Sequence, residues 1–200
     1  MFDGANQYLF HLMTAPPNLS GGALAAPLAM AEWAIFVGPT MLVLLWVLGD
    51  DDDKRAAVGA CLSAFLALAL AAAMSSLHFH PRPFMDGLAR NYLHHAPDSS
   101  FPSDHATLLF ALGFSFWALR PTIWPSLWIL PLALACAVGW VRVYLGAHYP
   151  LDIVGAALLG LTGAFLLTTP PGRRTRDAVT SLGVWLYGFP AGFRRLNPPQ

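Results

Sequence analysis

Long apolar stretches separated by short polar segments dominate the chain. A helix that crosses a bilayer needs about 20 mostly apolar residues, and the stretches that approach this length are Leu24–Leu48, Ala56–Leu77, Ala106–Leu119, Ile123–Leu145 and Leu151–Thr168. The third stretch is short, but Ser103 or Asp104 could cap its helix and extend it. The pattern therefore predicts an all-α fold, a polytopic transmembrane helical bundle with five spans.

The two ends of the chain are less regular. Residues 2–14 are amphipathic, which predicts an N-terminal helix lying in the membrane interface. Residues 178–192 are apolar, but they are too short and too often interrupted by glycine and proline to indicate a further span. We therefore expect a single domain over residues 1–200 with five spans, or alternatively six, and with a basic tail over residues 172–200.

Composition supports a membrane protein and excludes other classes. Hydrophobic residues make up 56% of the chain and charged residues 11%, whereas about a quarter of a soluble domain is charged. The mean hydropathy of +0.53 excludes intrinsic disorder. The formal net charge is zero, and a nucleic-acid-binding protein would carry a basic excess.

Basic residues orient the predicted spans, because cytoplasmic loops of membrane proteins carry more Lys and Arg. With five spans, one side receives Lys54, Arg55, Arg120, Arg173, Arg174, Arg176, Arg194 and Arg195, and the other receives only Arg82, Arg90 and Arg142. The first side is therefore predicted to be cytoplasmic, together with the 172–200 tail, and the amino terminus lies outside. The acidic run Asp50–Asp53 is interpreted as a short solvated loop.

Most of the polar chemistry falls on the predicted outer side. Six of the seven histidines lie there, in or beside the segments 78–104 and 146–150. Three clusters stand out: His80-Pro81-Arg82-Pro83-Phe84, then Phe101-Pro102-Ser103-Asp104-His105, then Arg142, His148 and Asp152 with five and three residues between them.

The third cluster predicts a turn between two helices. Gly146 is placed to end one helix and Pro150 to begin the next. Asp152 can then accept a hydrogen bond from one imidazole nitrogen of His148 and orient the other as a base or nucleophile. Two helix amino termini, a hydroxyl and two guanidinium groups together favour a phosphate site.

These clusters carry a resemblance. Their order and spacing resemble the type 2 phosphatidic acid phosphatase superfamily, and the stretch HPRPF…HAPDSSFPSDHAT…RVYLGAHYPLD resembles its bacterial undecaprenyl-diphosphatase branch. The similarity covers residues 75–155, about 40% of the chain.

The resemblance implies a metal-independent phosphatase with no cofactor. By similarity, His148 attacks the terminal phosphorus, Asp152 supports it, and His105 protonates the leaving group. Arg82, Arg142 and Ser103 would bind the phosphoryl oxygens. Such positioning and positive charge are what phosphoryl transfer requires.

The chain departs from the family pattern in three places. Ser75 stands where the broader family has a lysine, Val141 where it has a serine, and Asp104 where it has a glycine. The missing lysine removes a phosphate contact that His78, His80 or Arg90 could replace. Asp104 belongs to the candidate phosphate site only if it points away from the anion or pairs with a cation.

Two further ionisable residues are candidates. Arg90 is a candidate for headgroup contact or for loop structure. Glu32 lies inside the first apolar stretch, where an ionisable group is costly and suggests function. It could pair with an arginine of the site or remain a protonated structural carboxyl.

The implied function is hydrolysis of undecaprenyl diphosphate to undecaprenyl phosphate and inorganic phosphate, which recycles the lipid carrier for peptidoglycan. The family also implies antagonism of bacitracin. The expected partners are a polyprenyl diphosphate and membrane lipids, in a bacterial inner (cell) membrane with the site on the extracytoplasmic side. The alternatives are a phosphatase for phosphatidylglycerophosphate or phosphatidic acid, and a non-catalytic lipid-phosphate transporter. The sequence leaves the oligomeric state open.

Overall fold

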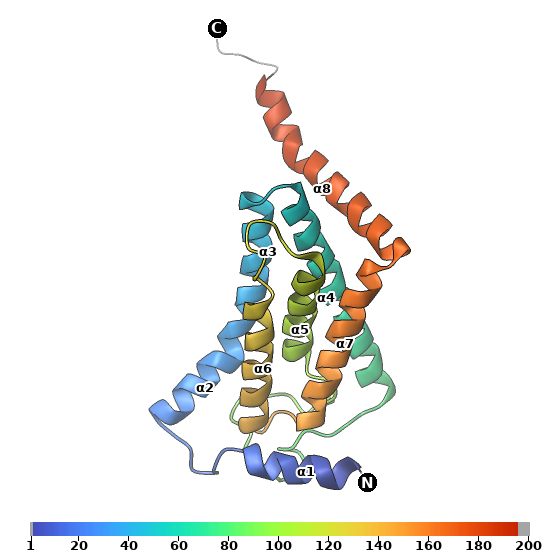
Figure 1. Ribbon diagram of the computed structural model, residues 1–200. Coiled ribbons are helices and arrows are strands. Elements are labelled where there is room, and N and C mark those ends of the chain that lie inside the picture. Colours follow the sequence, from blue (N-terminus) through green and yellow to red (C-terminus); the bar gives the residue numbers. More distant parts are fainter. Residues whose placement is uncertain (1, 196–200) are drawn as a thin grey trace.

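A computed structural model describes residues 2–195, which form helices joined by loops and contain no strand (Figure 1). The predicted all-α class is therefore confirmed. The elements are α1 (Phe2–Met13), α2 (Gly22–Trp33), the 3-10 turn η1 (Ala34–Phe36), α3 (Val37–Leu48), α4 (Asp51–Leu77), α5 (Asp104–Leu119), α6 (Ile129–Tyr144), α7 (Pro150–Thr168) and α8 (Pro170–Arg195).

The five predicted spans correspond to helices of the bundle. The continuous stretch from α2 to α3, and the helices α4 and α7, are long and apolar enough to cross a membrane. The helices α5 and α6 are apolar but shorter, with 16 residues each. Residues 178–192 belong to α8, which does not meet the same criterion within the described residues.

Three span boundaries differ from the prediction, each for a local reason. The first span is interrupted by η1. Pro39 has no N–H to donate to the carbonyl oxygen of Ile35, and its ring crowds that carbonyl, so a regular α-helix cannot continue through this point. The second begins at Asp51, since the Asp50 carboxylate caps the helix by accepting from the amides of Asp52 and Asp53. The fourth begins at Ile129 rather than Ile123, because residues 120–128 form a loop.

Helix α5 forms the centre of the bundle, packed against α4, α6 and α7. On one side its residues Ala111, Leu112 and Phe116 meet alanines of α4, and on the other Leu109 and Phe110 meet residues of α6 and α7. Close approach to α7 depends on Gly160, where a Cβ atom would lie 2.7 Å from the backbone nitrogen of Ala111. The core is therefore built from small residues and tight helix contacts.

The helix α1 lies across one end of the bundle, next to the loops that join α4 to α5 and α6 to α7 (Figure 1). Its Phe10 is buried against Val143 and Tyr149, and the Asn6 side chain accepts a hydrogen bond of 3.0 Å from the Leu151 amide. The predicted N-terminal helix is therefore present. It covers the end of the bundle that carries the motif residues Arg82, Arg142 and His148.

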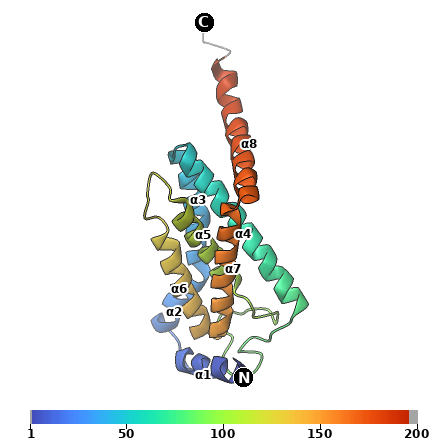
Figure 2. The same cartoon turned by 45° about the vertical axis from the view of Figure 1, so that its right-hand side comes forward.

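The opposite end carries the acidic run and α8. The interpretation of Asp50–Asp53 as a solvated loop is wrong, because Asp51, Asp52 and Asp53 form the first turn of α4. Asp53 is also buried and accepts hydrogen bonds from the amides of Thr122 (2.6 Å) and Ile123 (3.2 Å). The helix α8 packs on α4 and α7 and then extends beyond the bundle (Figures 1 and 2). The last five residues of the predicted tail lie outside the described residues.

Candidate active site

Three separate segments meet at the α1 end of the bundle: the loop 78–103, the start of α5, and the turn between α6 and α7. They bring together three buried side chains, those of Arg82, Arg142 and His148. Around these lie Ser103 and Asp152, also buried, and His105, which is half-buried. The structure thus gathers the residues that the motifs singled out.

His148 lies in the turn that follows α6. Gly146 allows this turn because its φ is 78°, a left-handed conformation that glycine adopts without a steric penalty. The His148 side chain is 2% exposed, and its Nδ1 lies 2.8 Å from the carbonyl oxygen of Ser100. A carbonyl can only accept, so Nδ1 carries the proton and the Nε2 lone pair faces the site.

His148 is held in its neutral form. Burial lowers its pKa to about 4, and the positive charges of Arg142 and Arg82 act in the same direction, while hydrogen bonding to Asp152 opposes them. At physiological pH the imidazole is therefore uncharged. An uncharged imidazole with a fixed tautomer is the form in which histidine acts as a nucleophile.

Asp152 supports His148 less directly than predicted. Its Oδ2 lies 3.3 Å from Nδ1 of His148, farther than the Ser100 carbonyl. The same oxygen accepts a 2.7 Å hydrogen bond from the Tyr149 amide and one from the Ser100 hydroxyl. Asp152 therefore fixes both the start of α7 and Ser100, and Ser100 in turn orients the imidazole.

Arg82 contacts the imidazole ring of His148 directly. Its NH1 group lies 3.2 Å from Nε2 of His148 and donates a 2.9 Å hydrogen bond to the Ala147 carbonyl. Its Nε donates to Asp98 at 2.7 Å. Asp98 is 63% exposed, so this carboxylate lies at the mouth of the site, whereas the guanidinium group is buried. A phosphoryl group approaching Nε2 would meet Arg82 first.

Arg142 enters from the last turn of α6. Its NH2 group hydrogen-bonds to Nε2 of His95, and its Nε is buried with no partner among the described residues. A buried guanidinium N–H without an acceptor costs free energy, about 1–3 kcal/mol or more for a charged group. A phosphate oxygen would remove that cost.

Ser103 precedes α5 at the N-cap position, but its hydroxyl makes no capping hydrogen bond. That hydroxyl is also buried and has no partner among the described residues. His105, in the first turn of the helix, interacts electrostatically with Arg142, His148 and His95. The start of α5 therefore presents a free hydroxyl and an imidazole next to two guanidinium groups, a donor set suited to an anion.

Other predicted site residues lie at the edge of the cluster or outside it. Asp104 is exposed and interacts electrostatically with Arg82 and Arg142, but it forms no ion pair with either in the described part of the chain. Arg90 is exposed and lies 5.5 Å from the ring centre of Tyr92. Glu32 is exposed on α2 and makes no ion pair with an arginine of the site within residues 2–195.

The structure also shows what occupies the place of the missing lysine. The Ser75 hydroxyl donates a 2.9 Å hydrogen bond to the Phe101 carbonyl and so supports the loop before α5. Of the proposed replacements, neither His78, His80 nor Arg90 contacts Arg82, Arg142 or His148 in any described interaction. The residue that does is His95.

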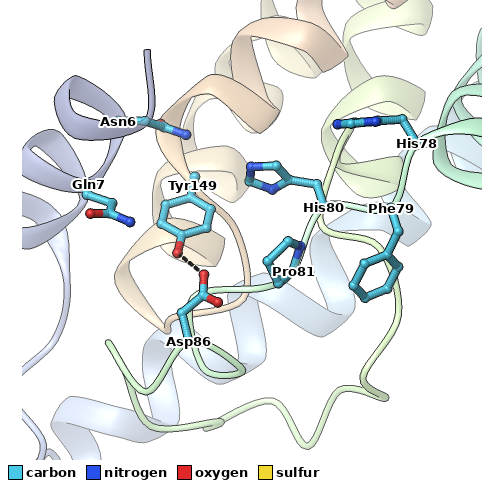
Figure 3. A pocket seen from close by; sticks show the side chains of 8 residues that line it. All are labelled: Asn6, Gln7, His78, Phe79, His80, Pro81, Asp86 and Tyr149. Atoms are coloured by element: carbon cyan, nitrogen blue, oxygen red, sulfur yellow. Dashed lines mark hydrogen bonds between the residues drawn. The ribbon is translucent and has the colours of Figure 1, made fainter. Parts of the chain in front are cut away.

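A cavity of about 450 Å³ lies beside this cluster but is distinct from it. It opens between α1 and the 78–86 segment, and its lining includes Asn6, His80 and Tyr149 (Figure 3). The Tyr149 hydroxyl donates a 2.7 Å hydrogen bond to Asp86, and the His80 ring faces the Tyr149 ring. Neither arginine of the cluster lines this cavity, so it is not the phosphate site.

Three contacting residues were missed in the sequence, and all come from the segment 91–100. Ser100 binds His148 and Asp152, Asp98 binds Arg82, and His95 binds Arg142. The sequence signal for His95 is its position between the first two motifs, on the same predicted side.

Comparison with known proteins agrees with this arrangement. The model of the PAP2 superfamily matches residues 56–176. YbjG of Escherichia coli (strain K12), described as a candidate undecaprenyl-diphosphatase, is 34% identical over 165 residues, which cover 82% of this chain and 81% of YbjG. The "Bacitracin transport permease protein BcrC" of Bacillus licheniformis is 37% identical over 145 residues, 71% of this chain and 69% of that protein.

Two further similarities concern activity and fold. The "Undecaprenyl-diphosphatase BcrC" of Bacillus subtilis (strain 168) is 27% identical over 138 residues, 68% of this chain and 69% of that protein. The crystal structure of Aquifex aeolicus LpxE superposes with a TM-score of 0.62 over 81% of this chain and 93% of LpxE, at 20% identity. At that identity the match shows a shared fold.

Proposed function

The chain belongs to the PAP2 superfamily and is a lipid-phosphate hydrolase, and from this premise we propose that it removes the terminal phosphate of undecaprenyl diphosphate. The products are undecaprenyl phosphate and inorganic phosphate. The observation that carries the proposal is the position of Arg82, whose NH1 lies 3.2 Å from the Nε2 lone pair of a neutral, buried His148. A phosphoryl group bound by Arg82 would therefore lie next to the nitrogen that we propose as the nucleophile.

The substrate assignment rests on relatives and on the position of the site. Relatives over more than two thirds of the chain bear the name undecaprenyl-diphosphatase. The site lies at one end of an apolar bundle (Figure 1). A polyprenyl tail can therefore remain in the bilayer while its diphosphate reaches His148.

In the first step, Nε2 of His148 attacks the terminal phosphorus. The N–P bond forms, the bond to the bridging oxygen breaks, and the electron pair stays on that oxygen of the lipid monophosphate. We infer that His105 protonates this oxygen, a step that matters less for a phosphate leaving group than for an alkoxide. Arg82, Arg142 and the Ser103 hydroxyl bind the equatorial oxygens, where charge accumulates.

In the second step, water attacks the phosphorus of the phosphohistidine. The N–P bond breaks, the electron pair returns to Nε2, and His105 takes a proton from the water. While phosphorylated, the imidazole carries positive charge, and the Ser100 carbonyl and the Asp152 carboxylate lie 2.8 and 3.3 Å from Nδ1 to stabilise it. In this scheme His105 transfers the protons, the two arginines stabilise the negative charge on the phosphoryl oxygens, and Asp152 stabilises the positive charge on the imidazole.

The distribution of basic residues supports a sidedness for this reaction. We propose a multi-pass protein of the bacterial inner (cell) membrane, with α1 and the site on the extracytoplasmic side and the 172–200 tail in the cytoplasm. Hydrolysis on that side returns the lipid carrier for peptidoglycan synthesis. It also removes the diphosphate that bacitracin binds, so overproduction is expected to raise bacitracin resistance.

The test is phosphate release by the purified protein in detergent with a chelator, given undecaprenyl diphosphate, phosphatidylglycerophosphate and phosphatidic acid separately. We expect the diphosphate to be the best substrate. The variant His148→Ala is expected to lose activity by a factor on the order of 10³ or more, and substrate labelled in its terminal phosphate should label wild type but not this variant.

The other outcomes separate the alternatives. Faster release from phosphatidic acid or phosphatidylglycerophosphate would assign a different lipid. Binding of lipid without any phosphate release would identify a transporter. Activity that survives in His148→Ala would contradict the phosphohistidine mechanism. The variant His78→Ala is the matched control, because His78 is an exposed histidine of the same end that contacts none of these groups.

A further inference from the structure

The loop between Asn91 and Ser100 completes the site. It supplies one partner each to Arg142, Arg82 and the pair of His148 and Asp152. Two of these partners, Asp98 and Ser100, have an evident electrostatic or orienting effect. The third, His95, is a histidine whose ring centre lies 6.4 Å from that of His148, with the rings at 75°.

His95 is held in place by its own turn. The Asn91 side chain makes two hydrogen bonds to it, donating to the His95 carbonyl at 2.9 Å and accepting from the His95 amide at 3.0 Å. The preceding residue, His94, has a left-handed φ of 50°, which residues other than glycine seldom adopt. The turn therefore fixes the backbone of His95, and the contact with Arg142 holds its ring.

The contact with Arg142 determines where the His95 proton lies. A guanidinium group only donates, so Nε2 of His95 must accept from Arg142, and the proton of the neutral ring is on Nδ1. Burial lowers the pKa of His95 to about 4, assisted by the charges of Arg142 and Arg82, so the ring is neutral at physiological pH. No described residue accepts a hydrogen bond from its Nδ1.

The two arginines are not equivalent with respect to the nucleophile. Arg82 touches Nε2 of His148, where the terminal phosphorus must lie, within about 3–3.5 Å of the attacking nitrogen. Arg142 acts on His148 through its charge but forms no described hydrogen bond with it; its Nε has no partner among the described residues, and its NH2 is paired with His95. The Nε of Arg142 can therefore bind the attacked phosphoryl group, while His95, on the NH2 of the same guanidinium group, lies one step farther from the attacked phosphorus, where the second phosphate of a diphosphate would be.

We propose that His95 determines specificity for a diphosphate: its Nδ1–H donates to an oxygen of the leaving phosphate, while its Nε2 holds the NH2 group of Arg142 next to that phosphate. This inference rests on the proposed function. When the bridging P–O bond breaks, the leaving phosphate gains negative charge, and the neutral donor and the guanidinium both stabilise it. A lipid monophosphate has no such group and gains nothing from the pair.

Three variants of His95 separate its two contacts. His95→Ala removes both. His95→Gln places an amide near the position of Nε2 and so keeps an acceptor for Arg142, whereas His95→Asn places an amide donor near Nδ1 and loses the contact with Arg142. The matched control is His78→Ala. Each variant is first compared with wild type by size-exclusion profile and melting temperature in detergent.

The measurement is competitive inhibition of phosphate release by two probes, inorganic phosphate and methylenediphosphonate, together with KM for the prenyl diphosphate. We expect His95→Ala to raise Ki for methylenediphosphonate and KM for the diphosphate roughly tenfold or more, with less than about a threefold change in Ki for phosphate. Both His95→Gln and His95→Asn should restore part of the diphosphate affinity.

An equal rise of both inhibition constants in His95→Ala would overturn the proposal and reduce His95 to a support for the terminal-phosphate site. Unchanged constants in all three variants would also overturn it. If His95→Ala fails to fold, the Gln and Asn variants replace it. A larger rise in Ki for methylenediphosphonate than in Ki for phosphate would support the proposal, and equal rises would contradict it. Wild type that releases no phosphate from any lipid would instead contradict the proposed function.

Discussion

Both ends of the bundle bury polar side chains, but these are hydrogen-bonded at one end and partly without partners at the other. At the end opposite α1, the buried Asp53 carboxylate accepts four hydrogen bonds, from the Thr122 amide and hydroxyl and from the amides of Ile123 and Asp50. At the α1 end, the buried Nε of Arg142 and hydroxyl of Ser103 have no partner among the described residues.

The difference separates a structural polar cluster from a binding site. Hydrogen bonds that satisfy a buried carboxylate stabilise the fold, and removing them is costly. Buried donors without acceptors destabilise the fold and are retained where a ligand supplies the acceptors. Substitution of Asp53 should therefore lower stability and leave activity per folded molecule unchanged, whereas substitution of Ser103 should lower activity without lowering stability.

The largest effect on stability is expected at Asp53. The change Asp53→Ala leaves the Thr122 and Ile123 amides without their acceptor and frees the loop before α6, so the free energy of unfolding should fall by roughly 2–4 kcal/mol. The measurement is the melting temperature in detergent, with phosphate release by the surviving folded fraction. Loss of activity per folded molecule would show that this end also contributes to the site.

A smaller effect, on activity, is expected at Ser103. The change Ser103→Ala should lower kcat/KM about 10- to 100-fold, because one hydrogen bond to the transferring phosphoryl group is lost. The melting temperature should stay the same or rise, since this hydroxyl makes no capping bond that alanine would remove.

Ser115 offers a matched control for Ser103. Its hydroxyl is also buried without a partner in the described part of the chain, and it lies on the same helix, 12 residues farther on. At 1.5 Å per residue that is about 18 Å from the site. Ser115→Ala should leave kcat/KM unchanged. An equal loss of activity in both variants would mean that the effect comes from α5 packing and not from phosphate binding.

The same comparison shows what the sequence could and could not predict. The spans follow from apolar stretches, and the positions of Arg82, His148 and Ser103 follow from their motifs. Both are local signals. The hydrogen bond between Ser100 and Asp152 joins residues 52 positions apart, and that between Arg142 and His95 joins residues 47 apart. Contacts of this kind depend on how loops fold over the bundle end, so their residues carried no pattern.

The prediction that Asp53 lies in a solvated loop was wrong for a related reason. An acidic run after a glycine normally indicates a solvated loop, and Asp51 and Asp52 are indeed exposed. Only the packing of residues 122–123 against the start of α4 makes Asp53 different from its neighbours. The chain position of Thr122, about 70 residues away, gives no sign of that contact.

The smallest effect is a dependence of stability on pH that belongs to the α1 end. His148 and His95 both have their pKa lowered from 6.5 to about 4, in each case first by burial. Between these values the unfolded chain binds protons that the folded chain excludes, so the free energy of unfolding should decline as the pH falls from about 6.5 towards 4. The melting temperature of the double variant His95→Gln, His148→Gln should decline less over this range than that of wild type.

Asp50 lies at the end of the bundle opposite α1, and its contribution to stability should not change between pH 6.5 and 4. Hydrogen bonds from the Asp53 amide and the Thr122 hydroxyl hold the pKa of Asp50 below its ordinary value of 3.8, so its contribution is lost only at still lower pH. The loss of stability between pH 6.5 and 4.5 should therefore persist in Asp50→Asn and shrink in the double histidine variant. If the two variants shift equally, the buried histidines are not its source, and the neutral, nucleophilic state assigned to His148 loses its support.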